Sequence, residues 1–476
     1  MPLYIDVAAV RIQRYLSRTP SLRGRRGASA ALVAATTFNE GTEDDKDKNR
    51  DSDRDRVLRG RADLNDAAGE VDGVLSLVVN DPRVLDDRRE IDKLIRDVLV
   101  YLRQKLPGAE FQVAQGKGDT YLEARINEIN PNIERGKVVL DMPTVSEFPL
   151  TAWCGVCRID PAVTSVDLRN DDGVRDLCAD CAMRHSNKIR LLGRTAEERL
   201  AIAIGAPPPD LKASLNKLAE LGDQKSGGTH LATIHADGNS MGQFFTTLAG
   251  TPGVDRAEVV KEFTTCTFET LAAATCEVRR PKDSMLCVVP HVLGGDDVLV
   301  TLPADRAWEF IVFFLHDFNK RAERLVRKLG LDTHSSLTIP TMSAGLVFAR
   351  RDFPFSLVVE QAEISLRQAK SAGAGQEAMV QFVDITSDGP TPPGQAISLA
   401  ALKANQQALN GLVRLPRAHQ ARLGEKLRTG GPAAAKTLAQ RVGTAASITP
   451  FLSDTFQGDE FISLDDALRI ARWWRA

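Results

Sequence analysis

His291 to Pro303 reads HVLGGDDVLVTLP, in which two runs rich in valine and leucine flank two glycines and two adjacent aspartates. Because glycine adopts positive φ without steric cost, Gly294 and Gly295 between two extended runs predict a tight β-hairpin turn. Such a turn does not require a pair of acids, and adjacent carboxylates repel each other unless a cation neutralises them. The stretch therefore predicts a hairpin whose aspartates, Asp296 and Asp297, form either an ordinary acidic turn or part of a metal site.

A third aspartate follows another predicted strand, within LATIHADGNSMGQFF from Leu231 to Phe245. The apolar strand ends at Asp237, and Gly238-Asn239 lead into a helix that begins near Met241. If this strand lies beside the hairpin, three carboxylates surround one place, and hard oxygen ligands of this kind suit Mg²⁺, which keeps several waters. Two such ions, about 3.5–4 Å apart, clamp the attacking and leaving oxygens of a phosphoryl transfer.

Four of the seven cysteines form two knuckles, CGVC (Cys154, Cys157) and CADC (Cys178, Cys181). In a reducing compartment, two C-x-x-C units at this spacing predict a tetrahedral zinc site, since each knuckle supplies two thiolates. Four thiolates leave no open coordination position, so this zinc would be structural. The alternatives are a redox pair or four free thiols, and His185 is either a substitute ligand or a surface histidine. The other three cysteines are expected in a core: Cys266, Cys276 and Cys287.

Length and composition describe an ordinary globular chain. The 476 residues suffice for two to four domains, and 43% are hydrophobic. The net charge of −2 means that any nucleic-acid contact must come from local basic patches. No apolar run approaches the roughly 18–20 residues that cross a bilayer, and the first twenty residues lack a signal-peptide core. We therefore expect a cytoplasmic protein with no membrane partner.

The pattern of strands and helices predicts an α+β chain in four parts. Residues 1–148 alternate strands and helices around a charged insertion at 41–67, whose nine acids and seven bases predict a mobile loop. Residues 149–225 hold the cysteines and a helical stretch. Residues 226–390 form a second α/β unit around the hairpin, and both units fit a ferredoxin-like sheet. Residues 391–476 read as a small all-α bundle.

Four motifs in order resemble one known family: ADGNSMG (236–242), GGDD (294–297), SAGLVFA (343–349) and AEISLRQAKSAG (362–373). They are similar to the catalytic palm of the large subunit of type III CRISPR effector complexes, the cyclic-oligoadenylate synthase family. Diguanylate cyclases with their GGDEF signature are more distant relatives of the same palm. IDVAAVRIQRYLSRTPSLRGRRGAS (5–29) looks like that subunit's first palm. A four-cysteine module between two palms and a C-terminal helical domain also fit, so the resemblance covers nearly the whole chain.

The resemblance implies roles for individual residues. Asp237, Asp296 and Asp297 would bind Mg²⁺ or Mn²⁺, and Gly294 and Gly295 would let the backbone approach the nucleotide. Lys370 corresponds to the family's lysine near the triphosphate, or else is an exposed helix lysine. Ser343 contacts base or ribose, or else is a small packing residue. The remaining nucleotide-binding candidates are Gly238 and Asn239.

The first palm carries a weaker copy of the same pattern. YIDVAAVRIQ parallels TIHADGNSMGQ, and AQGKGDTYLEA parallels VLGGDDVLVTL, which sets Asp6 and Asp119 near Asp237 and one hairpin aspartate. We interpret this half as non-catalytic, supplying a nucleotide-binding face, unless the alternation is coincidental. Four arginines either meet phosphates or form a solvated basic loop: Arg18, Arg23, Arg25 and Arg26.

The resemblance implies a nucleotidyltransferase that makes cyclic oligonucleotides, above all cyclic oligoadenylate, from ATP in CRISPR-type antiviral defence. The alternatives are an RNA-binding effector scaffold with a weakly active palm, or a mono- or dinucleotide cyclase. The expected partners are ATP, CRISPR RNA, small effector subunits or target RNA, and a second copy of the chain. Many family members begin with a histidine-aspartate nuclease domain, whereas the only His-Asp pair here, His316-Asp317, lies in a predicted helix. We therefore expect no nuclease domain and no DNA cleavage.

Overall fold

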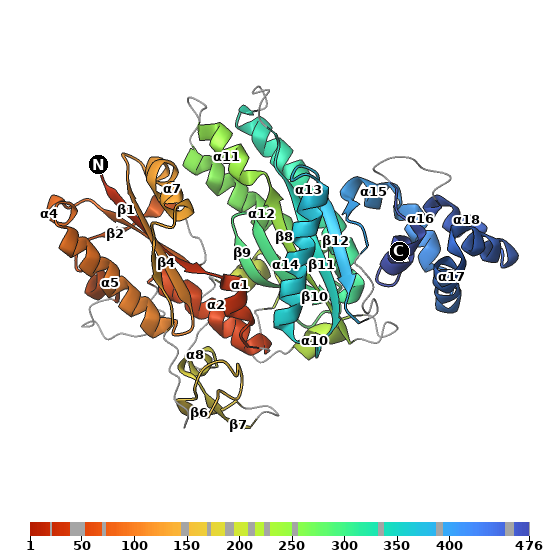
Figure 1. Ribbon diagram of the computed structural model, residues 1–476, viewed down its shortest axis with the longest axis horizontal. Helices are drawn as coiled ribbons and strands as arrows, with labels where there is room; N and C mark the ends of the chain where they lie inside the picture. The colour runs from red at the N-terminus through yellow and green to blue at the C-terminus, as the bar shows by residue number, and fades with distance from the viewer. Residues whose placement is uncertain are drawn as a thin grey trace. The chain divides into compact units, whose positions relative to one another are not determined.

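The computed structural model places two compact units along the chain (Figure 1). The first unit comprises residues 1–202, 209–214 and 255–261, and the second comprises residues 203–208, 215–254 and 262–476. The structure describes residues 1–19, 21–38, 53–68, 73–143, 152–168, 173–185, 195–207, 215–222, 229–249, 256–331, 338–386, 394–452 and 461–475. The division into four domains stays a prediction.

The first unit is built on a five-stranded sheet in the order β2-β3-β1-β4-β5. Its central strand, β1, is antiparallel to both β3 and β4. The strands are β1 (Leu3–Val10), β2 (Asp63–Leu64), β3 (Val74–Val79), β4 (Glu110–Lys117) and β5 (Val139–Asp141). Alternating side chains of a strand face opposite sides, and Ile5 and Val7 of β1 are almost completely buried.

Helix α5 (Arg88–Lys105) illustrates how the sequence forms the first unit. Ile91, Leu94, Ile95 and Val98 recur at helical spacing and are buried, and Asp87 caps the helix by accepting from the backbone N–H of Arg89. The other helices of this sheet are α1 (Ile12–Ser17), α2 (Leu22–Thr36), α3 (Asp53–Leu58), α4 (Pro82–Leu85), α6 (Tyr121–Ala124) and α7 (Asn130–Glu134), with a π-helix at Arg125–Ile129.

The cysteine module of the first unit is a small hairpin and a helix. Strands β6 (Thr164–Asp167) and β7 (Val174–Leu177) pair antiparallel, and α8 (Ala179–Arg184) follows, with α9 (Ala196–Ala203) further along the chain. Helix α8 packs on α2. A side chain at Gly27 of α2 would collide with the backbone carbonyl of Arg184, so the two helices meet without intervening side chains.

The second unit holds a six-stranded sheet in the order β13-β12-β11-β8-β10-β9. Strand β8 lies at its centre, antiparallel to β10 and to β11, and β12 runs parallel to β11. The strands are β8 (His230–Asn239), β9 (Val289–Gly294), β10 (Asp297–Pro303), β11 (Thr341–Arg350), β12 (Met379–Asp384) and β13 (Ile397–Ser398). In chain order, β8, β9, β10 and β11 are separated by helices except at the β9–β10 hairpin.

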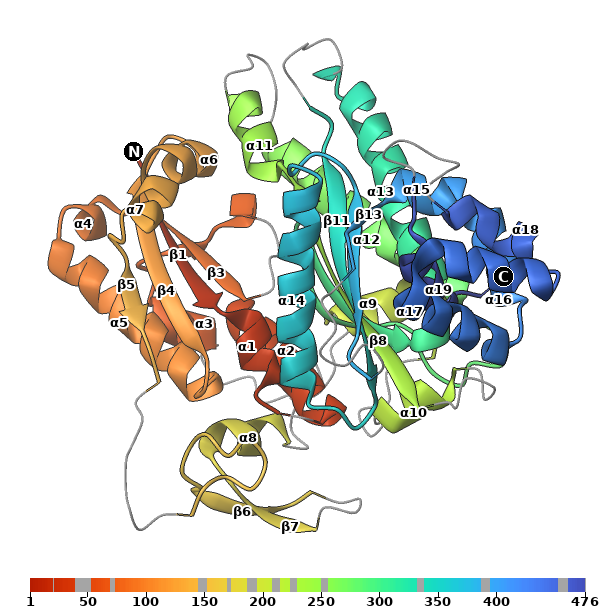
Figure 2. The ribbon, with the colours of Figure 1, turned by 45° about the vertical axis from the view of Figure 1, so that its right-hand side comes forward.

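Helices cover both faces of the second sheet (Figure 2). On one face lies α14 (Phe355–Ala372), and on the other lie α12 (Arg256–Val278) and α13 (Ala307–Lys328). Helix α13 buries Trp308, Ile311, Leu315 and Phe318 on one stripe, and each such side chain contributes roughly 1.5–3 kcal/mol by leaving water. The shorter helices before the hairpin are α10 (Leu215–Glu220) and α11 (Met241–Ala249).

The C-terminal residues are helical and end against the second sheet. Trp473 stacks on Phe348 with ring centroids 5.4 Å apart and donates its indole N–H to Asp384. Trp474 lies near Trp308 and donates to Asn410. The helices are α15 (Leu399–Ala404), α16 (Gln406–Val413), α17 (Arg417–Arg441), α18 (Ala445–Ile448) and α19 (Leu464–Ala471).

Three sequence-based expectations need correction. The charged insertion at 41–67 is not a loop throughout, because residues 53–58 form α3 and residues 63–64 form β2, while 41–52 lie outside the described residues. Val57 and Leu58, two of its few apolar residues, are buried, which explains why this part folds. Cys276 is exposed, although Cys266 and Cys287 are buried. His185, expected at the surface or on zinc, is a buried residue of the first unit.

No helix in the described ranges combines the length and the apolar character that crossing a membrane requires.

Candidate active site

Two neighbouring strands bring Asp237 and Asp297 together. The ladder between β8 and β10 includes the pair Ala236 and Val298, and the next position on each strand is an aspartate. Asp237 also lies opposite Ser343 of β11. Residues two apart on a strand share a face, so His235 and Asp237 point to the same side of the sheet. The arrangement that the sequence predicted for these two aspartates is thus present in the backbone.

The tip of the hairpin is a two-residue turn. Gly294 pairs with Asp297, which leaves Gly295 and Asp296 to reverse the chain. Gly295 has φ +61°, a conformation that glycine adopts without strain. Apart from the neighbouring residues in the chain, no atom of the described residues lies within 4 Å of a Cβ added at Gly294 or Gly295. The predicted hairpin is confirmed.

Asp296 turns back from the tip toward the end of β8. A Cβ added at Gly238 would lie 2.6 Å from Oδ2 of Asp296 and would also collide with Met241. Burial, and secondarily the negative charges of Asp237 and Asp297, raise the pKa of Asp296 to about 7. A carboxyl with this pKa is in an environment that disfavours its negative charge, and a bound cation would reverse that penalty.

Lys370 provides the positive charge nearest to Asp237. Its ammonium, in the last turn of α14, forms an ion pair with Oδ2 of Asp237 and donates to the carbonyl of Gly238 over 2.7 Å. Both side chains are about one-third exposed, at 28% and 33%. Lys370 is therefore neither a free surface lysine nor remote from the carboxylates, and it bonds to two oxygens that could instead face a metal ion.

Asp297 has a different partner, His235. The imidazole Nε2 lies 2.7 Å from Oδ1 of Asp297, and the histidine side chain is 6% exposed. Sequence reasoning did not single out this residue. The available signal was its place on the strand, two residues before Asp237 and therefore on the same face of the sheet.

Two predicted nucleotide contacts lie inside the protein. Asn239 donates to Thr341, to Ser343 and to the carbonyl of Glu377, and both Asn239 and Ser343 are almost completely buried. Ser343 also donates to the Glu377 carbonyl and accepts from the backbone N–H of Met379. In this structure these two residues connect the end of β8 and the start of β11 to the start of β12. Their hydrogen bonds fix the backbone beside Asp237.

The donor set at the end of β8 fits a hard divalent cation. It comprises three carboxylates and the Gly238 carbonyl, all oxygen donors of the kind that Mg²⁺ and Mn²⁺ prefer. Within the described residues, however, only the four cysteines have ligand atoms that all lie within 4.8 Å of one another. The carboxylates are more spread out, because Asp237 is held by Lys370 and Asp297 by His235.

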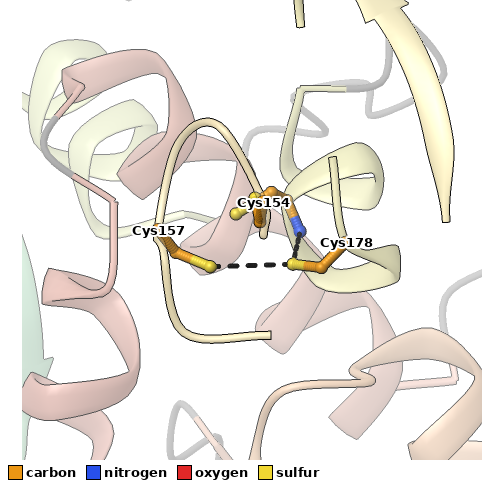
Figure 3. Close-up of side chains that lie close together, drawn as sticks. Cys154, Cys157 and Cys178 are labelled. Atoms are coloured by element: carbon orange, nitrogen blue, oxygen red, sulfur yellow. Dashed lines mark hydrogen bonds between the residues drawn. The ribbon is translucent and has the colours of Figure 1, made fainter. Parts of the chain in front are cut away.

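The cysteine module fits zinc by distance as well as by chemistry. Its four sulfur atoms form the compact group just described, and the sulfurs of Cys157 and Cys178 are 3.7 Å apart (Figure 3). A tetrahedron with Zn–S bonds of about 2.3 Å has sulfur atoms about 3.8 Å apart. The backbone N–H of Cys181 points to the sulfur of Cys178 over 3.4 Å. Cys154, Cys157, Cys178 and Cys181 could therefore hold zinc, and three of them are buried.

The first sheet lacks this carboxylate arrangement. Asp6 of β1 is buried and accepts from the hydroxyls of Ser76, over 2.5 Å, and Tyr121, over 2.9 Å. Asp119 follows β4, which in its sheet has the place of β11 and not of the β9–β10 hairpin. The suggested parallel between Asp119 and a hairpin aspartate is therefore wrong.

The arginines near the start of the chain are not a solvated loop. Arg25 and Arg26 lie in α2 and are buried, and Arg26 forms an ion pair with Glu197. Arg18 forms an ion pair with Asp160 and donates to the carbonyl of Gly108. Arg23 donates to the carbonyls of Leu168 and His185. These side chains connect parts of the first unit, so phosphate binding by them has no support.

Comparison with known proteins agrees with the geometry. Residues 230–379 match the family model described as Cas10/Cmr2, second palm domain. No curated protein matches the chain. Among solved structures, a Csm1-Csm4 cassette in complex with cA4 matches with a TM-score of 0.59 at 13% identity, covering 99% of this chain and 69% of the other.

Two further structures give similar values. A Csm1-Csm4 cassette in complex with pppApA has a TM-score of 0.57 at 13% identity, over 100% of this chain and 69% of the other. A Csm1-Csm4 subcomplex of the type III-A CRISPR-Csm interference complex has a TM-score of 0.53 at 13% identity, over 99% and 69%. Identity this low shows the fold alone. With the palm match, these findings agree with the resemblance seen in the motifs: residues 230–379 are similar to the Cas10/Cmr2 second palm domain, and the chain shares its fold with the matched Csm1-Csm4 structures.

Proposed function

We propose that this chain is a nucleotidyltransferase that joins ATP into cyclic oligoadenylate, as the Cas10-like subunit of a CRISPR-type antiviral system. The observation that carries the proposal is the pairing of Asp237 with Asp297 at the end of β8 and β10, with Asp296 at the adjoining hairpin tip, inside a matched palm domain. Structures of the same fold contain AMPPNP, pppApA, cA3 and cA4, which is the series from substrate analogue to cyclic product.

The reaction transfers an adenylyl group. The 3′-hydroxyl of one nucleotide attacks the α-phosphate of the next, the new phosphodiester forms, and pyrophosphate leaves. Bound Mg²⁺ or Mn²⁺ supplies Lewis-acid stabilisation of the phosphate charge in such transfers. In our proposal Asp237, Asp296 and Asp297 bind these ions, and the open backbone at Gly294 and Gly295 admits the nucleotide.

Lys370 has two roles in this proposal. Without nucleotide its ammonium neutralises Asp237, as in the structure. With divalent ions on the carboxylates, the same ammonium becomes available to the triphosphate, because the cations take over the neutralisation of Asp237. A lysine is a point charge on a flexible stem and suits such a change of partner.

The rest of the chain is assigned supporting roles. We propose that both sheets are ferredoxin-like palms, that the first is non-catalytic, and that zinc on the four cysteines stabilises the first unit. Since the matched structures are Csm1-Csm4 subcomplexes, we further propose that this chain joins other effector subunits and CRISPR RNA.

The test is incubation of the purified chain with ATP and Mg²⁺ or Mn²⁺, with products identified by mass spectrometry and pyrophosphate measured in parallel. We expect cyclic oligoadenylate from the wild type and none from the Asp296→Ala/Asp297→Ala double variant. Target RNA and partner subunits are added in a second series, because the activity of an effector subunit can depend on them.

Three results would reject or redirect the proposal. Pyrophosphate release that survives the double substitution would reject the assigned carboxylates. A cyclic mono- or dinucleotide as the sole product would make the chain a smaller-ring cyclase. RNA binding with a steep salt dependence, but no turnover under any condition, would indicate an RNA-binding scaffold.

A further inference from the structure

His235 contacts Asp297 but is not among the site residues that the sequence motifs implied. His235 is 5% exposed, and its Nε2 lies 2.7 Å from Oδ1 of Asp297, whose side chain is 30% exposed. The histidine thus joins the interior of the sheet to a carboxylate at its accessible end. A polar contact of this kind from a buried residue restricts the rotation of the carboxylate.

The surroundings of the imidazole decide which nitrogen carries the proton. Within the described ranges, Nδ1 of His235 is buried and has no hydrogen-bond partner. A carboxylate oxygen accepts hydrogen bonds, so the ring nitrogen that faces it, Nε2, carries a proton. In that tautomer Nε2–H donates to Oδ1 of Asp297, and the second oxygen of the carboxylate remains available.

Packing holds the ring in place. His235 lies between Leu299 of β10 and Gly345 of β11 in the sheet. A Cβ at Gly345 would collide with the Ala362 carbonyl and lie 2.5 Å from the Leu366 nitrogen, so α14 packs directly on the strand here. The helix that covers this face is the same one that carries Lys370 to Asp237.

We propose that His235 is a positioning residue of the candidate metal site, fixing the orientation of Asp297 so that one of its oxygens stays directed to a divalent cation. This inference rests on the metal-binding part of the proposed function. Groups that bond to metal-ligating side chains orient them, and their loss typically lowers metal affinity by about 10- to 100-fold. The competing explanation is that His235 is an ordinary buried residue whose hydrogen bond has no consequence for metal binding.

The experiment measures Mn²⁺ affinity directly, by electron paramagnetic resonance of free Mn²⁺ titrated with the full chain in its zinc-loaded form. The variants are His235→Phe, which keeps the ring volume but removes the donor, and His235→Gln, whose amide can reach the same oxygen. We expect His235→Phe to bind Mn²⁺ about 10- to 100-fold more weakly and His235→Gln to stay within about threefold of wild type.

A matched control is His291 of β9, which is also buried and bonds to the Thr301 hydroxyl over 2.8 Å rather than to an aspartate. His291→Phe should leave Mn²⁺ affinity unchanged. In an activity assay, His235→Phe should raise the Mn²⁺ concentration that gives half-maximal pyrophosphate release, with kcat recovering at saturating Mn²⁺.

Unchanged Mn²⁺ affinity in His235→Phe, or an equal loss in His291→Phe, would overturn the inference. If His235→Phe does not fold, His235→Asn replaces it, since its shorter amide cannot reach Asp297, and equal affinity of the Asn and Gln variants would overturn the inference. Wild type that binds Mn²⁺ through the aspartates but makes no product would reject the proposed function alone. Wild type that binds no Mn²⁺ at these aspartates would overturn both.

Discussion

The two sheets of this protein share a plan but not a chemistry. Strands β2-β3-β1-β4 of the first sheet and β9-β10-β8-β11 of the second have the same order, and both central strands are antiparallel to both neighbours. Each central strand is followed by a non-glycine residue with φ 54°, Arg11 in the first sheet and Ser240 in the second, and a helix starts at the next residue. These two residues give a structural register between the sheets.

In that register Asp237 corresponds to Ala8, and His235 corresponds to Asp6. The strand pairing agrees, because Ala8 lies opposite Val74 where the second sheet has Asp237 beside Asp297. Gly73 then stands in the place of Asp296. The first sheet therefore has the backbone of the candidate metal site without the carboxylates proposed as its ligands, and its one acid on this strand is satisfied by hydroxyls of Ser76 and Tyr121.

The difference teaches that this backbone does not require metal for its stability. The second unit buries the aromatic side chains of α13 and the C-terminal tryptophans around its sheet. The first unit has in addition a four-cysteine module whose helix α8 packs on α2. We thus expect the metal of the first unit to stabilise the fold and the metal of the second to serve chemistry.

Removing zinc should produce the largest effect and should separate the two units. All four tyrosines and Trp153 lie in the first unit, whereas Trp308, Trp473 and Trp474 lie in the second, so the experiment uses a Trp153→Phe background in which tryptophan emission reports the second unit alone. Cys154→Ser/Cys181→Ser should lower the unfolding free energy of the first unit by several kcal/mol, since structural zinc contributes roughly 10 kcal/mol of binding free energy. The measurement is urea unfolding followed by tyrosine near-UV circular dichroism and, separately, by tryptophan emission.

The exposed Cys276 provides the control for zinc removal. Cys276→Ser should change neither transition. If the double substitution left the tyrosine transition in place, the zinc module would not stabilise the first unit.

Exchanging one acid in each sheet tests the contrast directly. Asp237→Asn should reduce pyrophosphate release by about 10³-fold, the scale expected when a group that stabilises transition-state charge is lost. Asp6→Asn should leave that rate within about threefold, but should cost about 1–3 kcal/mol of stability because one buried hydroxyl loses its acceptor. Comparable losses of rate in both variants would contradict the assignment of catalysis to the second sheet alone.

Replacing Gly238 or Gly294 with alanine tests the close approach of Asp296 to Gly238. Gly238→Ala should displace Asp296, whose Oδ2 lies 2.6 Å from the added Cβ, and should weaken Mn²⁺ binding by about tenfold, or about 1.4 kcal/mol. Gly294→Ala meets no protein atom within 4 Å and should leave Mn²⁺ binding unchanged.

If Gly294→Ala nevertheless raises the KM for ATP, the backbone at the hairpin tip contacts the nucleotide, as the resemblance implies. Equal Mn²⁺ affinities of the Gly238 and Gly294 variants would show that Asp296 does not depend on its contact with Gly238.

The smallest expected effect is a pH dependence of stability. Because the pKa of Asp296 is about 7 in the folded protein and near 3.8 in an unfolded chain, the folded state takes up a proton first as pH falls. In Mg²⁺-free buffer, the free energy of unfolding should therefore increase as the pH is lowered from 8 to 4. The full pKa shift sets an upper bound of roughly 4 kcal/mol on this gain in unfolding free energy. Solvent screening at a partly exposed carboxyl should reduce the gain to about 1 kcal/mol.

The measurement compares the tryptophan unfolding transition of wild type and Asp296→Asn across this pH range. Asp296→Asn cannot ionise and should be more stable than wild type above pH 7, and this advantage should shrink as the pH falls toward 4 and the wild-type carboxyl takes up its proton. A difference that does not vary with pH would mean that Asp296 ionises normally in the folded protein.

Much of the candidate site could be predicted because its signals are local. The hairpin followed from two glycines between extended runs, and the clustering of the four cysteines followed from the spacing of two C-x-x-C knuckles. Asp237 was identified because a strand ended there. The prediction for Asp119 failed because it depended on strand order. Asp119 was aligned with the hairpin by its glycine-aspartate pattern, although β4 occupies the place of β11 in its sheet. Burial of Arg25 and Arg26 was also missed, since a basic run gives no sign that it will be buried or that Glu197, far along the chain, will face Arg26.

By itself the sequence determined which residues can bind cations and where strands turn, because glycine conformation, thiolate chemistry and the apolar period act within a few residues. Only the tertiary structure decided which partner each acid has. Asp237 meets Lys370 from a helix more than a hundred residues away, Asp296 is pressed against Gly238, and Asp297 meets His235. Charge interactions depend on distance in space and on burial, and the folded chain sets both.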